Sequence, residues 1–434
     1  MRRLLALAIV ASTVGSAAYA LDLEQAYQQA LKNDPQWAAI NNQYLSDSLK
    51  VELSHGALKP TVGLSAAVNA NKVDPESAAS YNYTGTQIAL QLRQPLYRAD
   101  LWKAYSKAQA LNSVNEANLR QKLQEQVQRV SEAYFNVLRA EETLGASKSE
   151  EAALKRQLEQ AQKRFDVGLI AKTDVLEAQA QLDGATASRI SQEVGLASAR
   201  EVLASIIGAD ASQLSGLRAD FIVTAPQPSN PDDWVKLAQD KNPQLASARF
   251  NYEAAQQAVA EQRSAYRPTV DLVASLSNRD NGNTLPVSAN NGSQMTAGVE
   301  LQWPLYTGGR TATAIKQASF ASDAARDQVT SIERQLTAQT RTAYLNASAD
   351  SYRVAARQQA VKSSEAALAA TKAGYDVGTR NIVDVLLAER NVYAAKRDHA
   401  NSRYDYVINT LKLRSASGQL TALDIKELNG WLGK

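Results

Sequence analysis

The sequence predicts a mostly helical protein that also carries two long β-hairpins, and three observations support this fold class. Its 11 prolines leave residues 96–225 and everything after 304 free of the strongest helix breaker. Between residues 60–95 and 268–304, helical periodicity gives way to alternation of apolar and polar side chains. Finally, landmarks of the first half recur in the second half in the same order. These features together predict a duplicated unit of helices, one hairpin and a pair of long helices.

The first 20 residues predict a secretory signal peptide. Two arginines precede a short apolar run, and Ala18-Tyr19-Ala20 is a small-residue cleavage pattern. The apolar run is too short to span a bilayer. The chain has no cysteine, which excludes disulfides and a lipid anchor on a cysteine. We therefore expect the mature protein to begin at Leu21.

The duplication predicts repeats over residues 21–225 and 226–434, with the linker at Ala225–Pro231. Pro60-Thr61-Val62 matches Pro268-Thr269-Val270, and Asp-Val-Gly ends a helical run in both halves, at Gly168 and Gly378. Each repeat is expected to begin with helices. The hairpins are then predicted at 60–95 and 268–304, and the long helix pairs at 98–208 and 309–418.

Apolar residues at coiled-coil spacing define the long helices. Leu123, Val127, Val130, Tyr134 and Val137 step by four and three, and a second series from Ala347 to Tyr375 recurs every seven residues. A sustained period near 3.5 predicts helices packed as coiled coils. At 1.5 Å per residue, the run from Arg98 to Asp166 predicts a helix of about 100 Å.

The hairpins are predicted to have strands of about 10–12 residues. Val62, Leu64, Ala66 and Val68 alternate with small and polar residues, and polar loops follow at 71–82 and 278–294. A sheet on a soluble core is one interpretation. The length and alternation instead favour outer-membrane barrel strands. Because four strands cannot close a barrel, that interpretation requires several chains to share one.

Composition argues against several other classes of function. The net charge is only +3 and both signs are intermixed, so no nucleic-acid partner is indicated. The chain has two isolated histidines, no cysteine and no catalytic motif. We therefore expect that it is not an enzyme and that it binds neither a metal nor a cofactor.

The chain resembles the TolC family of bacterial outer-membrane efflux and type I secretion channels, over residues 21–430. The motifs that carry this resemblance are AYFNVL at 133–138, RFDVGL at 164–169, AGYDVGTR at 373–380, IVDVL at 382–386 and PLYTGG at 304–309. The match is closer to the family's non-lipidated namesake than to its lipid-anchored drug-efflux branch.

The resemblance implies a homotrimer in the bacterial outer membrane with a periplasmic extension. Four strands per protomer would form a twelve-stranded barrel in outer-membrane lipid, and the long helices a coiled-coil tunnel. Such a channel is a passive exit duct for drugs, as in multidrug resistance, for secreted proteins, or for both. Its expected partners are a periplasmic adaptor (membrane fusion) protein and an inner-membrane RND or ABC transporter.

Gly168 and Gly378 are predicted to close their helices with positive φ. A plain helix-to-helix corner explains this locally. The resemblance adds that these corners are the periplasmic tips, where Leu169, Thr379 and Asn381 would contact the adaptor.

An aspartate begins the next helix in both repeats, at Asp174 and Asp384. A carboxylate interacts favourably with the positive N-terminal end of a helix, and this alone could explain an aspartate at either position. The resemblance implies that Asp384 lies in the pore constriction as an acidic selectivity ring. Its relatives carry a second aspartate one turn later, where this chain has Leu387. The constriction is thus expected to be less acidic and more apolar.

The resemblance also implies a gate latch. Tyr375 and Arg380 match family residues that hold the entrance closed, with Asp174 and Thr173 as partners on the neighbouring helix pair. Tyr375 also ends the seven-residue apolar series, so a packing role is the alternative.

A second class of protein fits the long helices: a periplasmic coiled-coil adaptor or scaffold that does not span the outer membrane. Adaptors carry compact β-domains around a single coiled-coil hairpin. The two long β-hairpins therefore favour the channel.

Overall fold

The computed structural model describes residues 20–74, 76, 79–218, 220–282 and 291–433. The predicted signal peptide lies outside these residues except for Ala20, and so do residues 283–290 of the predicted loop at 278–294.

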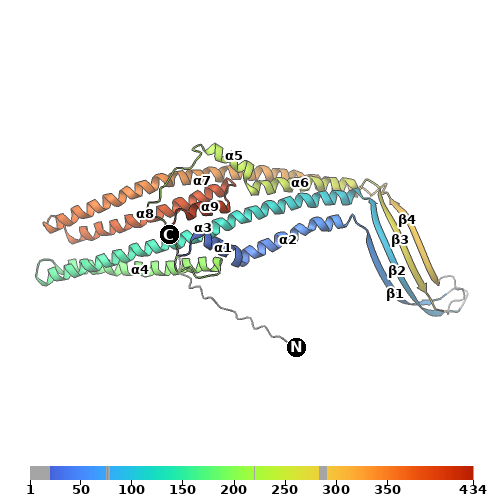
Figure 1. Cartoon of the computed structure of the whole chain (residues 1–434), viewed down its shortest axis with the longest axis horizontal. Helices are drawn as coiled ribbons and strands as arrows, with labels where there is room; N and C mark the ends of the chain where they lie inside the picture. The colour runs from blue at the N-terminus through green and yellow to red at the C-terminus, as the bar shows by residue number, and fades with distance from the viewer. Residues whose placement is uncertain (1–19, 75, 77–78, 219, 283–290, 434) are drawn as a thin grey trace, which may run out of the picture. The chain divides into compact units, whose positions relative to one another are not determined.

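The same order of elements occurs twice along the chain (Figure 1). The first series is α1 (Leu23–Asn33), α2 (Pro35–Gly56), β1 (Thr61–Val73), β2 (Tyr81–Tyr97), α3 (Ala99–Asp166) and α4 (Lys172–Ile207). The second is α5 (Pro231–Lys241), α6 (Pro243–Ser264), β3 (Thr269–Asp280), β4 (Gly292–Gln302), α7 (Arg310–Asp376) and α8 (Ile382–Ala416), followed by α9 (Ala422–Asn429).

The predicted long helices are confirmed, and their ends lie close to the predicted ones. Helices α3 and α7 have 68 and 67 residues, and they contain no proline. Helices α4 and α8 end before Gly208 and Gly418, whose φ angles of 67° and 71° are those of left-handed turns. No helix within the described residues is both long and apolar enough to cross a bilayer.

The strands form one antiparallel sheet in the order β1-β2-β3-β4. Both predicted hairpins are confirmed, but β2 has 17 residues, more than the 10–12 expected. The strand continues past Pro95 because the β2–β3 register shifts between Pro95 and Tyr97. Such an irregularity accommodates a residue that has no backbone N–H to donate.

The two faces of this sheet differ in polarity. Antiparallel partners share a face, so the registers assign every strand residue to one side. One face is apolar and exposed, with Leu64 74%, Val68 72% and Met295 79% exposed; its other large members are Val62, Ile88, Leu90, Leu272, Leu276, Val299 and Leu301. The opposite face carries mainly glycine, serine, asparagine and glutamine, together with Arg93 and Arg279.

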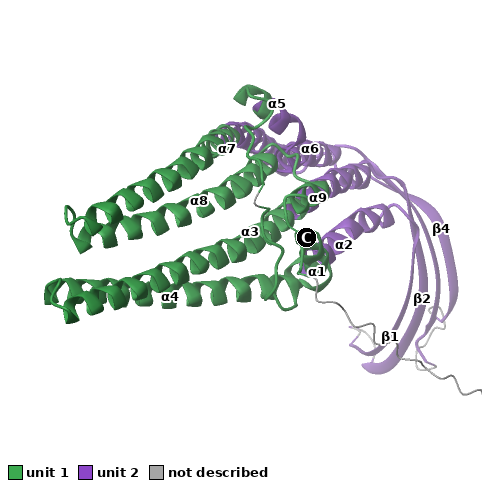
Figure 2. Ribbon diagram, turned by 60° about the vertical axis from the view of Figure 1, so that its left-hand side comes forward, with its two compact units in different colours: residues 1–38, 123–234, 340–434 green, residues 39–122, 235–339 purple. Residues whose placement is uncertain are grey.

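The chain divides into two compact units, coloured separately in Figure 2. Unit 1 comprises residues 1–38, 123–234 and 340–434, and unit 2 comprises 39–122 and 235–339. The sheet belongs to unit 2. A smaller apolar cluster in the same unit joins Ala238 and Leu245 to Leu336.

Unit 1 has the larger core, and the predicted coiled-coil series contributes to it. Val127, Val130, Tyr134 and Val137 of α3 are all at most 2% exposed. The Tyr134 hydroxyl lies 2.8 and 2.9 Å from the carbonyl oxygens of Leu21 and Ser215, and burial raises the pKa of Tyr134. This side chain thereby fixes the first residue of the expected mature chain to the middle of α3.

Candidate functional site at the helix tips

Two helix-to-helix turns in unit 1 form the candidate site. The α3–α4 turn contains Gly168, with φ 77°. The Gly168 N–H donates to the Phe165 carbonyl at 2.8 Å, and the Leu169 N–H to the Arg164 carbonyl at 2.9 Å. This pair of bonds is a Schellman motif, which satisfies carbonyls that the end of the helix leaves unpaired.

The α7–α8 turn repeats this motif around Gly378, with φ 81°. Its N–H donates to the Tyr375 carbonyl at 3.1 Å, and the Thr379 N–H to the Gly374 carbonyl at 2.8 Å. The prediction that both glycines close their helices with positive φ is confirmed. Because Val167, Leu169 and Val377 are at least 70% exposed, both turns present apolar side chains to solvent.

Gly374 makes the second turn different from the first. The Arg380 N–H and the Thr379 hydroxyl also donate to its carbonyl oxygen, at 3.2 and 3.0 Å. A Cβ atom on Gly374 would lie 2.9 Å from Cγ of Arg380 and 3.1 Å from Oγ1 of Thr379. The first repeat has Arg164 at the equivalent position, 210 residues earlier. Absence of a side chain at 374 therefore lets Thr379 and Arg380 fold back over the end of α7.

The two aspartates begin their helices in different ways. Asn381 and Asp384 form a capping box at the start of α8: the Asp384 N–H donates to Oδ1 of Asn381 at 2.8 Å, and the Asn381 N–H donates to Oδ2 of Asp384 at 3.3 Å. The N-cap residue of helix α4 is instead Ala171, whose side chain cannot accept a hydrogen bond, and Asp174 is simply an acid in the first turn. Only Asp384 thus has a defined structural role in its own helix.

Asp384 and Leu387 lie on one side of α8. Residues three apart in a helix are neighbours on its surface. The Leu387 side chain is 47% exposed, whereas Val385 and Leu386 are buried at 1% and 2%. An acidic side chain that is 33% exposed and an apolar one that is 47% exposed are consequently neighbours on the surface of α8, one turn apart.

A buried apolar cluster supports both tips. It joins the last turns of α3, the first turns of α4 and the first turn of α8, with Tyr375 of α7 packed against it. Its buried members are Leu154, Ala161, Ala178, Ala185, Ile382, Val385 and Leu386. The predicted role of Tyr375 as the last apolar contact of the α7 series agrees with this packing.

Arg164 connects the two tips. Its guanidinium carbon lies 4.7 Å from the centre of the Tyr375 ring, and its Nη2 lies 3.6 Å from Oδ1 of Asp376. A guanidinium group over an aromatic face is an attractive cation–π contact. The end of α3 is therefore held to the end of α7 by one arginine.

The predicted latch residues are arranged as follows. Arg380 lies 3.9 Å from the carboxylate of Asp384 one turn later, with 61% of its side chain exposed. Thr173 is exposed and Asp174 half-buried. Within the described part of this chain, neither of them makes a side-chain hydrogen bond or ion pair with Tyr375 or Arg380. The described residues also include no group of three or more acidic or histidine side chains able to hold a metal ion.

The family model described as "Outer membrane efflux protein" matches residues 26–209 and again residues 234–419. These two matches include both tips and both hairpins. The chain belongs to the outer membrane efflux protein family.

Known relatives of this efflux family cover the whole chain. Outer membrane protein TolC of Vibrio cholerae is 35% identical over 436 residues, covering 100% of this chain and 99% of the relative. TolC of Escherichia coli K12 is 32% identical, and the match covers 100% of this chain and 90% of that relative. The crystal structure of the Campylobacter jejuni CmeC outer membrane channel shares the fold, with a TM-score of 0.80, 17% identity and coverage of 95% and 90%.

Sequence reasoning assigned no role to Arg164 and Gly374, although both lie in the motifs that indicated the efflux family. The sequence feature that could have indicated a role for Gly374 is the presence of a glycine inside a good helix-forming run, four residues before Gly378. The signal for Arg164 is weaker, because its partners Tyr375 and Asp376 are more than 200 residues away in the sequence.

Proposed function

We propose that this protein is an outer-membrane channel that provides a passive exit duct for drugs, secreted proteins or both. One observation carries the proposal: the four-stranded sheet exposes a continuous apolar face and a polar opposite face, and the same chain continues from the sheet into helices of 67 and 68 residues. The description of the family, outer membrane efflux protein, supports this proposal.

The apolar face identifies the environment of the sheet. Val62, Leu64 and Val68 of β1 and Met295, Val299 and Leu301 of β4 are each more than 60% exposed. A contiguous apolar surface of this kind is costly in water and favourable in hydrocarbon. Alternation of apolar and polar side chains along each strand is the pattern of strands between lipid and a polar lumen.

We propose that three copies form one channel. An open sheet edge cannot face lipid, because its backbone donors and acceptors would be unpaired there. The number three comes from the family resemblance, and the sheet requires only that more than one copy take part. Residues 1–20 would direct export as a cleaved signal peptide, and 21–225 and 226–434 would be the two repeats.

The helix tips would form the closed periplasmic entrance. Asp384 would line the constriction as an acidic ring, with Leu387 as an apolar ring one turn away. Tyr375 and Arg380 would reach Asp174 and Thr173 of a neighbouring helix pair and so latch the entrance. The contacts of Arg164 with Tyr375 and Asp376 support this role, because they hold Tyr375 in place at the end of α7.

The exposed turns would dock the rest of an export apparatus. A periplasmic adaptor protein would contact the surface around Gly168, Leu169, Gly378, Thr379 and Asn381, and an inner-membrane transporter of the RND or ABC class would supply the energy. Leu169 is 72% exposed, as a docking residue must be. A photo-crosslinker at Asn381 should capture the adaptor, whereas one at exposed Ser191 in the middle of α4 should not.

Conductance tests the channel directly. Purified full-length protein added to a planar lipid bilayer should produce discrete, uniform current steps, and protein unfolded by heat should produce none. Cell fractionation should place the protein in outer membranes and require detergent for its release. Release by salt or alkaline buffer alone, with no conductance, would instead identify the alternative of a periplasmic adaptor or scaffold, which the two apolar hairpins do not favour.

A further inference from the structure

A surface cavity of about 250 Å³ lies in unit 1, between α7, α8 and the segment that includes Phe221. Its polar lining comes from His399 and Arg403 of α8 and from Ser351 and Gln358 of α7. The other described residues that line it are apolar. The described lining therefore contains two basic side chains and no carboxylate.

The two basic side chains are neighbours on one side of α8, because they lie four residues apart. Burial, together with the positive charge of Arg403, lowers the pKa of His399. The Arg403 guanidinium donates to the carbonyl oxygen of Arg218 at 2.7 Å, and it forms no ion pair within the part of the chain that the structure describes. Positive charge is thus gathered at the cavity without an acid to balance it.

The acids that could balance this charge have other partners. Glu142 of α3 acts to raise the pKa of His399, but its carboxylate accepts from the Tyr404 hydroxyl at 2.7 Å. Asp398 pairs with Arg357 of α7 at 2.9 Å. The described lining residues on α7 and on the 221–223 segment carry no charge.

The first repeat shows the same helix positions with their charges balanced. The long helices of the two repeats align 210 residues apart, so His399 corresponds to Arg189. Arg403 corresponds to Glu193 by the same offset. Arg189 pairs with Glu193 at 2.8 Å, and it pairs with Glu151 of α3 at the same distance. One base and two acids therefore form a closed ionic cluster there.

Neither acid of that cluster is retained in the second repeat. Arg403 takes the place of Glu193, and Val361 takes the place of Glu151. Like charges four residues apart on a helix repel each other. The second repeat thus has a basic pair where the first has a neutralised one, and an anion from solution would supply the missing charge.

We propose that this cavity binds a small oxyanion, a molecule with a phosphate or carboxylate group, between His399 and Arg403. A guanidinium group presents several N–H donors in one plane, which match the oxygens of such groups. The Gln358 amide and a protonated His399 would add further donors. The volume is sufficient, since a water molecule occupies about 30 Å³ in the liquid. The site goes beyond the proposed channel function, which requires no ligand here.

Anion binding and protonation of His399 would be coupled. An opposite charge within about 4–6 Å favours the charged form of a titratable group. A bound anion should therefore raise the pKa of His399, against the effects of burial and of Arg403. By linkage, the anion should bind more tightly below a pH of about 6.5 than above it.

The titration of His399 tests the site. Histidine hydrogen–deuterium exchange followed by mass spectrometry reports each of the two histidines of the full-length protein separately. Sodium sulfate is a suitable probe, because its charge is constant between about pH 5 and pH 8, the range in which histidine titrates. Compared with sodium chloride of equal ionic strength, sulfate should move the midpoint of His399 to higher pH and leave that of His55 unchanged.

Two substitutions and a matched control separate the site from a general salt effect. Arg403→Gln should abolish the shift, or require at least about tenfold more sulfate for it, because charge-assisted hydrogen bonds are lost. Arg390→Gln removes an exposed arginine of α8 that does not line the cavity, so the shift should persist. Arg403→Glu gives α8 the charges of the first repeat. It should raise the pKa of His399 without sulfate and make that pKa insensitive to sulfate.

A second anion distinguishes the two chemical sources. Succinate offers carboxylates, whereas sulfate has the tetrahedral shape of phosphate. The anion that shifts the His399 midpoint at the lower concentration identifies the class of ligand, and a shift by either one supports the site.

Two results would overturn the proposal. One is the same His399 titration curve in sulfate, succinate and chloride. The other is a shift of undiminished size in Arg403→Gln, or an equal shift at His55, because either would identify a general effect of salt. Channel conductance enters neither result, so failure of this site would leave the proposed function standing.

Discussion

Asp174 and Asp384 occupy equivalent positions of the two repeats, but their surroundings differ. Asp384 completes a capping box with Asn381, whereas Asp174 follows Ala171 and caps nothing. A substitution that removes the Asp384 side chain would therefore remove one of the two hydrogen bonds of the capping box as well as a charge. Asparagine keeps an oxygen for the cap and removes only the charge.

We predict that Asp384→Asn lowers the preference of the channel for cations. If three carboxylates line the constriction, their removal eliminates the local attraction for cations. The reversal potential in a planar bilayer under a salt gradient should move toward zero, and Asp174→Asn should move it much less. An unchanged reversal potential for Asp384→Asn would exclude this residue from the constriction.

The contact between Arg164 and Tyr375 affects how the latch is tested. Tyr375→Phe keeps a ring beneath the Arg164 guanidinium and removes only the hydroxyl. We predict that Tyr375→Phe combined with Arg380→Ser raises the conductance of the closed channel several-fold, because the proposed ion pair and hydrogen bond to Asp174 and Thr173 of a neighbouring helix pair would be lost.

The matched control for the latch lies on the same helix. Tyr352→Phe with Arg326→Ser replaces an exposed tyrosine and an exposed arginine of α7. This variant should conduct as the unmodified protein does, and equal conductance of the two double variants would rule out a latch at Tyr375 and Arg380.

At the level of elements, the turns depend on a backbone conformation that few residues adopt. Gly378 has φ 81°, and in that region a side chain costs about 1–2 kcal/mol. We predict that Gly378→Ala lowers the temperature at which the oligomer dissociates in detergent. Gly184→Ala, in the interior of α4 with open space around its Cβ, should instead leave that temperature unchanged or raise it, since alanine favours helix. Equal effects of the two substitutions would contradict a left-handed turn at Gly378.

The elements were predictable from sequence because prolines and periodicity mark their ends. The expected helix pair at 98–208 is observed as Ala99–Asp166 and Lys172–Ile207. The length of β2 was underestimated because Pro95 looked like a strand end, whereas the structure accommodates it by a register shift. The residue pattern of one strand cannot show that its pairing with a neighbouring strand shifts to accommodate a proline.

Contacts between distant residues were not predictable in the same way. Arg93 and Asp271 are 178 positions apart, and the partners of Arg164 lie in the other repeat. Neither pair follows from spacing or composition, because it depends on which strands and helices become neighbours. The duplication was visible in the sequence, but the division into two compact units, each built from parts of both repeats, was not.

For the whole molecule, stability should depend on pH through one histidine. Burial, together with the nearby Arg403, lowers the pKa of His399, while Glu142 acts in the opposite direction. The folded protein therefore holds this proton less tightly than the unfolded chain does. Stability is retained above a pH of about 6.5, the usual histidine value, and is lost as the pH falls below it through the folded-state pKa.

We predict that His399→Gln flattens the decline in melting temperature between pH 7 and pH 5. The second histidine of the chain, His55, is exposed and serves as the control. His55→Gln should leave that decline as it is. If both substitutions give the same slope as the unmodified protein, burial of His399 does not contribute to the pH dependence.

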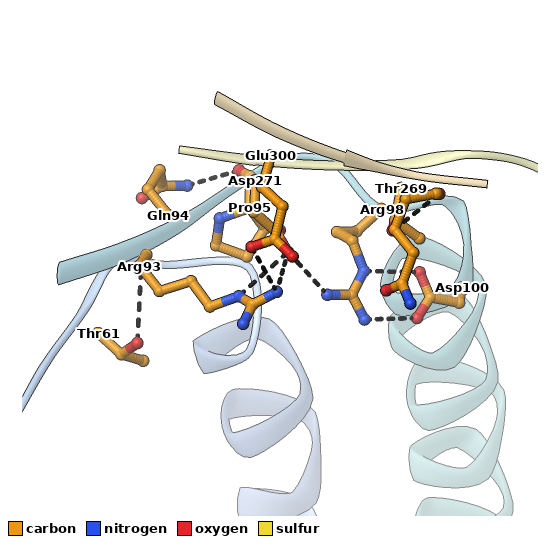
Figure 3. Close-up of polar contacts among 10 residues, drawn as sticks. Thr61, Arg93, Gln94, Pro95, Arg98, Asp100, Thr269, Asp271 and Glu300 are labelled. Atoms are coloured by element: carbon orange, nitrogen blue, oxygen red, sulfur yellow. Dashed lines mark hydrogen bonds and ion pairs between the residues drawn. The ribbon is translucent and has the colours of Figure 1, made fainter. Parts of the chain in front are cut away.

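The buried carboxylate of Asp271 in β3 accepts from Arg93 of β2 at 2.7 Å and from Arg98 at 3.4 Å (Figure 3), and this charged cluster has a consequence for assembly order. Because the two hairpins have the same register, each could in principle adopt either hairpin as its neighbour. A ring built in the wrong order would place Asp271 next to Gln302 instead of Arg93, and Arg93 next to Gly63 instead of Asp271. A buried carboxylate without its cation is costly. In a channel shared by several copies, the cluster would thus favour pairing of each first hairpin with the second hairpin of its own chain.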